Sequence, residues 1–116
     1  MSYPNDQGNP AGAIPVYIQS GGGISPLITD ASASLTANVA QTVLAENQAR
    51  RYFLIQNVAV PPVDIWMNFA GDDAVIGGAG SIKLAAGVTY ETGTTTPGSA
   101  ISLIAAVDTD VTVLEG

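Results

Sequence analysis

The chain has 116 residues, which is enough for one compact domain, and 47% of them are hydrophobic while only 11% are charged. Ten acidic residues face three basic ones, for a formal net charge of −7, and this balance argues against nucleic acid or an anionic membrane as a partner. Neither cysteine nor histidine occurs, which excludes disulfides, thiolate metal sites and catalysis through histidine.

Residues 1–30 differ from the rest of the chain. They hold four of the seven prolines and the run Gly21–Gly23, which disfavour a regular helix or a central strand. Their apolar side chains argue against a plain disordered tail. We expect an extended arm with one short strand near Ile14–Gln19, followed by a glycine hinge. The first residues lack the basic and apolar regions of a signal peptide, and no stretch is apolar enough to be a membrane span.

From Ala31 onward, apolar and polar residues mostly alternate, which is the pattern of a strand with one buried face. A helix over Ala31–Asn47 is the weaker interpretation, because Ser, Thr, Asn and Val are poor helix formers. Turn signals separate eight predicted strands: Ser32–Thr36, Gln41–Leu44, Arg51–Gln56, Asp64–Phe69, Ser81–Leu84, Val88–Glu91, Ser99–Val107 and Val111–Leu114. This spacing predicts a single all-β domain over residues 31–116, built as an antiparallel β-sandwich or a jelly-roll-like barrel.

The strand patterns also predict which side chains form the core. The unbroken apolar run Tyr52–Ile55 indicates a central strand that is covered on both faces. The next strand places Ile65, Met67 and Phe69 on the core face and Trp66 on the opposite face. Two further pairs are expected on one face of their strands: Ile82 with Leu84, and Val88 with Tyr90.

The residues offer no catalytic constellation. A glycosidase needs only two carboxylates, but it also needs an aromatic sugar cleft, and a small chain with 6% aromatic residues does not build one. The acidic pairs Asp72-Asp73 and Asp108/Asp110 lack the spacing of a calcium loop, and we interpret them as turn residues. Gly77–Gly80 precedes a strand rather than a helix, which argues against a phosphate site. We therefore expect no enzyme activity, no metal and no cofactor.

Three residues of the domain are candidates for a protein interface. Arg50 and Arg51 begin the predicted central strand, where neighbouring side chains face opposite ways. One of them can pair with an acidic residue of its own chain and the other with a neighbour, and the alternative is two solvated charges at a strand end. Trp66 is expected to be either half-covered by a loop or buried at an interface.

The arm supplies the remaining candidates. It carries apolar side chains among its prolines and glycines, namely Tyr3, Ile14, Val16, Tyr17 and Ile18. Burial of these side chains would be favourable, while ordering the arm opposes it with a comparable magnitude. We expect the arm to dock on neighbouring subunits. The alternative is that Ile14–Gln19 pairs as an extra strand at the edge of its own domain.

Four segments of the domain resemble small virion proteins of tailed bacteriophages, over roughly residues 45–116. They are NQARRYFLIQN (Asn47–Asn57), DIWMNFA (Asp64–Ala70), GSIKLAAGVTYET (Gly80–Thr92) and SAISLIAAVDTDVTVLEG (Ser99–Gly116). The resemblance implies a structural protein of the virion, assembled in the host cytoplasm.

These considerations lead to an expected function. The first hypothesis is a capsid decoration or cement protein that binds the outer capsid shell as a homo-oligomer, most simply a trimer. Its partners would be the major capsid protein or other virion subunits. The alternatives are a head- or neck-fibre base or a tail accessory protein of the same virion and, in another class, a carbohydrate-binding β-sandwich, which an exposed aromatic platform would favour.

Overall fold

The computed structural model describes residues 27–116, and it confirms the all-β prediction. That part of the chain contains nine short strands and no helix, and hence no helix that is long and apolar enough to cross a membrane. The strands are β1 (Thr29–Asp30), β2 (Ala33–Leu35), β3 (Gln41–Leu44), β4 (Phe53–Asn57), β5 (Ile65–Asn68), β6 (Ile82–Leu84), β7 (Thr89–Glu91), β8 (Ile101–Ala105) and β9 (Thr109–Glu115).

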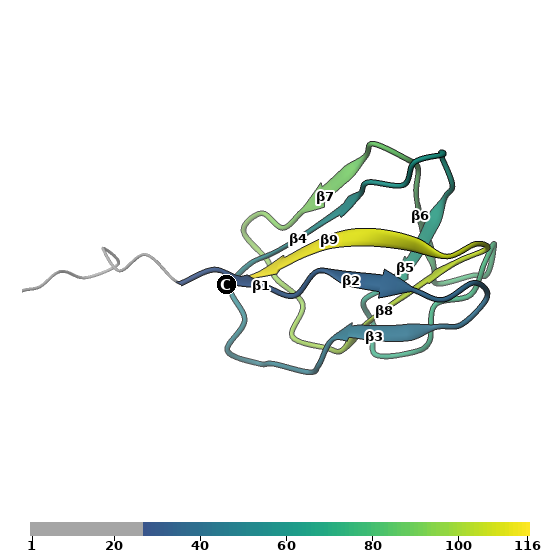
Figure 1. The fold of residues 1–116 in the computed structure, drawn as a ribbon. Helices are drawn as coiled ribbons and strands as arrows, with labels where there is room; N and C mark the ends of the chain where they lie inside the picture. The colour runs from purple at the N-terminus through teal and green to yellow at the C-terminus, as the bar shows by residue number, and fades with distance from the viewer. Residues whose placement is uncertain (1–26) are drawn as a thin grey trace, which may run out of the picture.

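The strands form two antiparallel sheets that pack face to face as a sandwich (Figure 1). Sheet A has the order β1/β2-β9-β4-β7, in which β1 and β2 pair with successive parts of the same edge of β9. Sheet B has the order β3-β8-β5-β6. Alternating side chains from the two inner faces fill the space between the sheets.

The connectivity is that of a jelly roll. The first half of the chain pairs with the second half in nested order: β1 and β2 with β9, β3 with β8, β4 with β7, and β5 with β6. Two further pairings, β4 with β9 and β5 with β8, join the folded halves into the two sheets. A long antiparallel hairpin wrapped into two sheets is the jelly-roll arrangement, so the predicted β-sandwich is confirmed, and its strands are connected as in a jelly roll.

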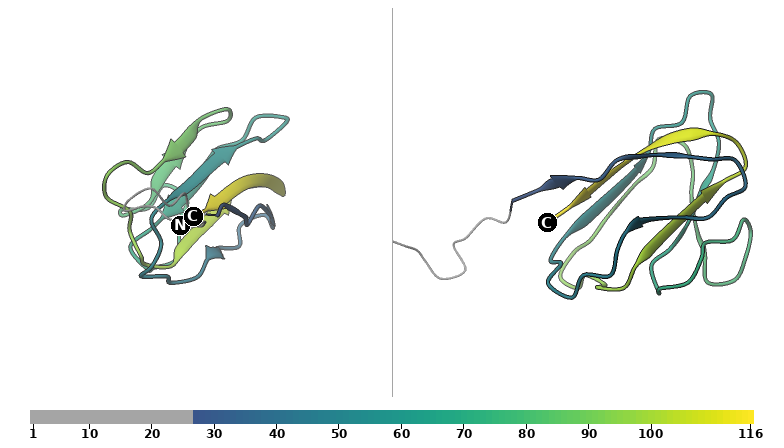
Figure 2. Two further views of the ribbon diagram at one scale, coloured as in Figure 1. Left: turned by 90° about the vertical axis from the view of Figure 1, so that its left-hand side faces the viewer. Right: turned by 60° about the horizontal axis from the view of Figure 1, so that its bottom comes forward.

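The sandwich has two distinct ends (Figure 2). The arm end holds the start of β1, and Thr29 lies opposite Glu115 there. The β2–β3, β4–β5, β6–β7 and β8–β9 connections gather at the other end, which we call the tip. Hydrogen bonds from Gly87 N to Asn57 O and from Asn57 N to Val88 O hold the β6–β7 connection beside the end of β4.

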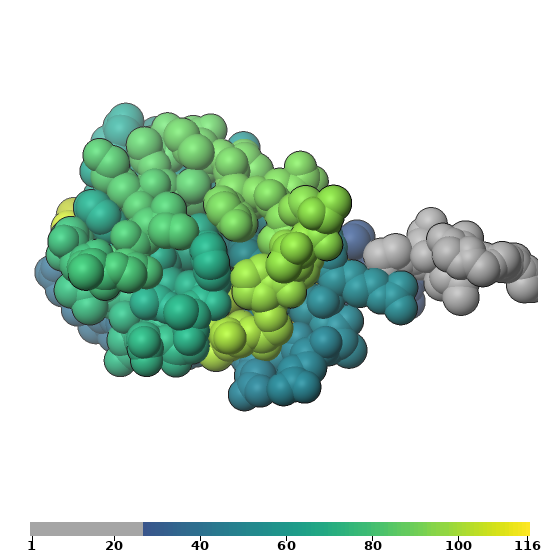
Figure 3. Space-filling view, turned by 180° about the vertical axis from the view of Figure 1, so that it is seen from behind, coloured from purple at the N-terminus to yellow at the C-terminus, as the bar shows by residue number. Residues whose placement is uncertain are grey.

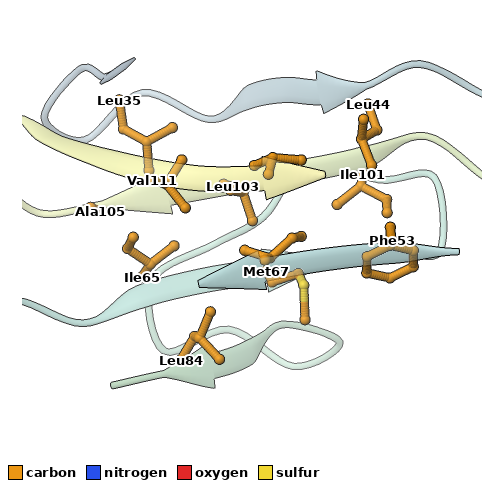
Figure 4. Packing of buried hydrophobic residues seen from close by; sticks show 12 residues of the cluster. Leu35, Leu44, Phe53, Ile65, Met67, Leu84, Ile101, Leu103, Ala105 and Val111 are labelled. Atoms are coloured by element: carbon orange, nitrogen blue, oxygen red, sulfur yellow. The ribbon is translucent and has the colours of Figure 1, made fainter. Parts of the chain in front are cut away.

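The core lies between the sheets (Figure 4). Phe53 and Ile55 of sheet A and Ile65 and Met67 of sheet B are completely buried. The core face predicted for the Asp64–Phe69 strand is therefore confirmed. The buried members of the whole core are Leu35, Leu44, Phe53, Ile55, Ile65, Met67, Leu84, Ile101, Leu103, Ala105, Val111 and Val113.

The strand covered on both faces is β8, not β4. In β4 burial alternates, with Phe53, Ile55 and Asn57 facing the core and Leu54 only half-buried on the outer face. All five residues of β8 are buried. The loop after β5 contributes to this cover, since the Ala74 amide donates to the Ser102 hydroxyl on the outer face of β8. The prediction that the strand over Tyr52–Ile55 is covered on both faces was wrong. A run of apolar residues does not show whether anything packs against the outer face of the sheet.

Three details differ from the sequence-based expectation. Ile82 was expected to face inward with Leu84, but it begins the edge strand β6 and is 41% exposed, whereas Leu84 is buried. Val88 is also exposed because it lies in the turn before β7, while Tyr90 packs on the core. Strand pairing begins at Thr29, two residues before the expected domain boundary at Ala31.

Candidate functional site

Arg50 links three segments at the arm end. Its side chain is fully buried, and its Nε donates to Glu115 Oε2 at 2.7 Å. Nη1 donates to the Pro97 and Ser99 carbonyls and Nη2 to the Ala45 carbonyl. Of the two arginines, Arg50 is therefore the one that pairs with an acidic residue of its own chain, and it is not a solvated charge. Its hydrogen bonds tie the β3–β4 and β7–β8 loops to the end of β9.

Arg51 is the exposed member of the pair. Its backbone joins the last residue, because Arg51 N donates to Gly116 O. Within residues 27–116 the only ion pair is that of Arg50, so the Arg51 guanidinium is available to an external acidic group. The interface role expected for Arg51 remains a prediction.

Trp66 lies on the outer face of sheet B, opposite the core face of Ile65 and Met67, as the alternation predicted. It is half-buried, and in the register of the sheet it stands between Lys83 of β6 and Ile104 of β8. Figure 3 shows this side of the molecule, where the β5–β6 segment covers much of the surface. A contact of Trp66 with another subunit remains a prediction.

The arm candidates lie outside the described residues. Tyr3, Ile14, Val16, Tyr17 and Ile18 all precede residue 27. Their proposed docking, and the alternative of an edge strand at Ile14–Gln19, therefore stay predictions.

The structure reveals an apolar surface at the tip that the sequence reading did not identify. Each of the four tip connections exposes at least one valine. These are Val39 (β2–β3), Val58 and Val60 (β4–β5), Val88 (β6–β7) and Val107 (β8–β9). Val60 is 92% exposed, and Pro61 and Pro62 beside it are exposed as well. Single exposed valines are ordinary on a protein surface, but three of these five, Val58, Val60 and Val107, line one groove.

A buried asparagine fixes the β4–β5 loop, which carries two of the five exposed valines, Val58 and Val60. Asn57 is completely buried at the end of β4. Its Nδ2 donates to the Val63 carbonyl at 2.7 Å and to the Leu84 carbonyl at 2.8 Å, and its Oδ1 accepts from Ala59 N at 3.0 Å. One side chain thus satisfies backbone groups at both ends of the β4–β5 loop. The exposed valines between these bonds are held by a defined frame.

An open groove of about 760 Å³ runs between this loop and the start of β9. One wall is apolar and consists of Val58, Val60, Pro61, Pro62 and Val63, and the other is largely polar, from β2 and residues 107–110. A shallower hollow continues the groove onto the outer face of sheet A and shares Ser34, Val58 and Asp110 with it. The groove is of the size that binds a small molecule or a short peptide.

The polar wall is acidic but already engaged. Asp108 Oδ1 accepts from Ala37 N at 2.8 Å, and Asp110 Oδ1 accepts from the Ser34 hydroxyl at 2.7 Å. Asp108 lies in the β8–β9 turn, as predicted, whereas Asp110, which was also interpreted as a turn residue, lies in β9 opposite Ser34 of β2. Over residues 27–116, no group of three His, Cys, Asp or Glu side chains is placed to hold a metal. No cation lines the groove.

Two titrating groups of the described domain have shifted pKa values, and both lie near the arm end. The hydrogen bonds from Ser32 lower the pKa of Asp30 below its ordinary value. The hydrogen bond that the Tyr52 hydroxyl donates to Glu91 Oε2 at 2.8 Å raises the pKa of Tyr52. The Asp30 bond is local, to a residue two positions along the chain, whereas the Tyr52 bond joins the residue before β4 to β7.

One signal for the tip was present in the sequence. All six residues of the segment Val58–Val63, VAVPPV, are apolar, and two of them are the prolines Pro61 and Pro62. Prolines exclude such a segment from a central strand, so its apolar side chains stay near the surface. The grouping with Val39, Val88 and Val107 depends on the sheet topology and has no local signal.

Comparisons with protein-family models, with curated proteins and with solved structures found no significant match for this chain.

Proposed function

We propose that the chain is a structural subunit of a tailed-bacteriophage virion, a decoration protein that binds the outer capsid shell as an oligomer. The observation that carries this proposal is the jelly-roll sandwich whose tip exposes valines from all four connections. Jelly rolls recur in capsid and lectin domains. An apolar surface with few charges can be covered by another protein at low desolvation cost, and this suits a subunit that works by being bound.

The aromatic side chains favour this proposal over a carbohydrate-binding module. Phe53, Phe69 and Tyr90 pack on one another, with ring centroids 5.6–6.4 Å apart. Tyr52 and Trp66 are half-buried. No aromatic side chain in residues 27–116 is fully exposed as a stacking platform for a sugar ring. A lectin of this fold would have to recognise sugars without such a platform.

Immunogold labelling of virions purified from the phage that encodes the chain tests the proposal. Gold distributed over the head surface is the expected result. Gold confined to the neck or the tail would replace decoration with the fibre-base or tail-accessory alternative. Particles that carry no copies of the chain, by labelling and by mass spectrometry, would refute a virion role.

A further inference from the structure

The groove at the tip begins where β4 leaves sheet A. The pairing of β4 with β9 ends at Asn57 and Val111, whereas β9 already begins at Thr109. Thr109 and Asp110 therefore have no β4 residue beside them. The diverging loop opens a gap at this point, with valines and prolines on one side and the edge of β9 on the other. An extended segment would meet apolar side chains on one wall and polar groups on the other.

The chain itself contains a segment of matching chemistry. No charged residue occurs between Asp6 and Asp30, and this stretch includes Ile14–Ile18 with the sequence IPVYI. In an extended conformation Ile14, Val16 and Ile18 point to one side. Three aliphatic side chains on one side of a neutral segment suit the valine-proline wall, and the segment brings no charge against the aspartates of the other wall. We propose that the tip groove of one copy binds Ile14–Ile18 of a neighbouring copy.

The distances along the chain favour a neighbouring copy over the same copy. The described part of the chain starts at the arm end, where the Leu27 and Ile28 segment lies beside Gly116. If the chain turns at the predicted hinge, four residues lead from Gly23 to Leu27 and seven lead back from Gly21 to Ile14. The leg that runs back is three residues longer than the leg that runs out, so Ile14 would lie roughly 10 Å past Leu27 in the direction of the tip. The seven residues of β9 alone span roughly 23 Å toward the tip. A turn at this hinge therefore leaves the segment short of its own tip, whereas a turn close to Leu27 would let the 13 residues from Ile14 to Leu27, roughly 43 Å when extended, reach it.

The tip of a second copy would fit the tip groove less well than the Ile14–Ile18 segment does. Two tips in contact would bring Asp108 and Asp110 of one copy close to the same residues of the other. The net charge of −7 on each chain adds to this repulsion. An arm-to-tip contact joins different surfaces of the two copies, and such heterologous contacts close into rings when the rotation between copies allows it. The expected trimer would be a ring of this kind.

Cysteine cross-linking of the full chain tests the proposal without background, because the chain has no cysteine. Val16→Cys and Val60→Cys chains are purified, mixed in equal amounts and oxidised, and linked peptides are identified by mass spectrometry. The matched control replaces Val60→Cys with Val75→Cys, since Val75 is 54% exposed but lies on the β5–β6 loop. The Val16–Val60 link should form at least roughly tenfold more than the Val16–Val75 link, because binding raises the effective concentration of one cysteine at the other.

Equal yields of the two links would overturn the proposal. A double variant that carries Val16→Cys and Val60→Cys in one chain would overturn the choice of a neighbouring copy if it links internally as a monomer. The average mass in sedimentation at micromolar concentration gives a second measurement: Val60→Asp should lower it and Val75→Asp should leave it unchanged. All these tests use only the purified chain, so their outcome is independent of whether the protein belongs to a virion.

Discussion

Arg50, which precedes β4, and Glu115, which ends β9, form an ion pair of 2.7 Å in which the guanidinium is fully buried. The remaining donors of the guanidinium reach three backbone carbonyls of two loops. The pair is a fixed part of the arm end, and it supports the region from which the N-terminal arm departs. The first prediction concerns this pair.

Arg50→Ala should destabilise the domain by about 3 kcal/mol, because it leaves three carbonyls and one partly buried carboxylate without their donor. Arg50→Lys should recover only a minor part of this loss, since an ammonium group cannot reproduce the planar set of donors. Urea denaturation measures both changes. Arg51→Ala is the matched control and should change stability by less than about 0.5 kcal/mol, because its side chain is exposed. Equal losses for the two alanine variants would contradict the assigned role of Arg50.

The alternation of burial along β4 predicts an alternating mutational response. Phe53→Ala and Ile55→Ala should each cost about 2–5 kcal/mol, because both side chains are completely buried in the core. Leu54→Ala should cost about 1 kcal/mol in the isolated protein, since Leu54 is only half-buried on the outer face. Denaturation curves in urea give the three values. A Leu54 loss as large as that of Ile55 would mean that the outer face of sheet A is covered.

Asn57→Ala should destabilise the domain by about 2–3 kcal/mol, because the Val63 and Leu84 carbonyls and the Ala59 amide lose their partner. Hydrogen exchange at the Ala59 amide should accelerate together with the loss of stability, since the frame of the tip loop depends on this side chain. Gln56→Ala, a change on the outer face of the same strand, is the control and should leave the Ala59 exchange rate unchanged. Unaltered Ala59 protection in Asn57→Ala would show that the loop is held by other contacts.

Stability at alkaline pH should depend on Tyr52. Its pKa is raised in the folded state by the hydrogen bond to Glu91, so the neutral hydroxyl is favoured by folding. This contribution is complete below the ordinary tyrosine pKa of about 10 and is lost as the pH rises through the higher folded value. The urea midpoint of the wild-type chain should therefore fall more between pH 9 and 11, roughly the range of this titration, than that of Tyr52→Phe. Parallel curves for the two proteins would contradict the prediction.

Deletion of residues 1–23 should leave the domain folded, because the buried cluster of the core consists of residues from Leu35 onward and β1 is retained. The melting temperature should change little, while incorporation into particles should be lost. If the deleted segment instead serves as an edge strand of its own domain, the deletion should cost more than about 2 kcal/mol of stability. A truncated chain that occupies particles at the wild-type level would refute the docking role of the arm.

Local alternation made most of the fold predictable. Gln41–Leu44 was predicted with the bounds that β3 has, and the core face of Ile65 and Met67 follows directly from period-two burial. Pairing between distant strands carries no such local signal. The two residues of β1 are held only by β9, and the five valines of the tip come from four connections that only the jelly-roll topology brings together. For Arg50 and Arg51 the sequence indicated that one of the two could pair within its own chain, but neither which one nor with which acidic residue.

The nested pairing of the jelly roll also sets an order in which the domain can fold. Ile65 and Leu84 of the innermost pair are 19 residues apart, whereas Thr29 and Glu115 of the outermost pair are 86 residues apart. Closing the longer loops costs more chain entropy, so pairing is expected to proceed outward from β5 and β6. Domains dominated by such distant contacts fold on the scale of about milliseconds to seconds. Until β9 pairs, one edge of β4 has no partner, and unpaired strand edges favour aggregation of newly made chains.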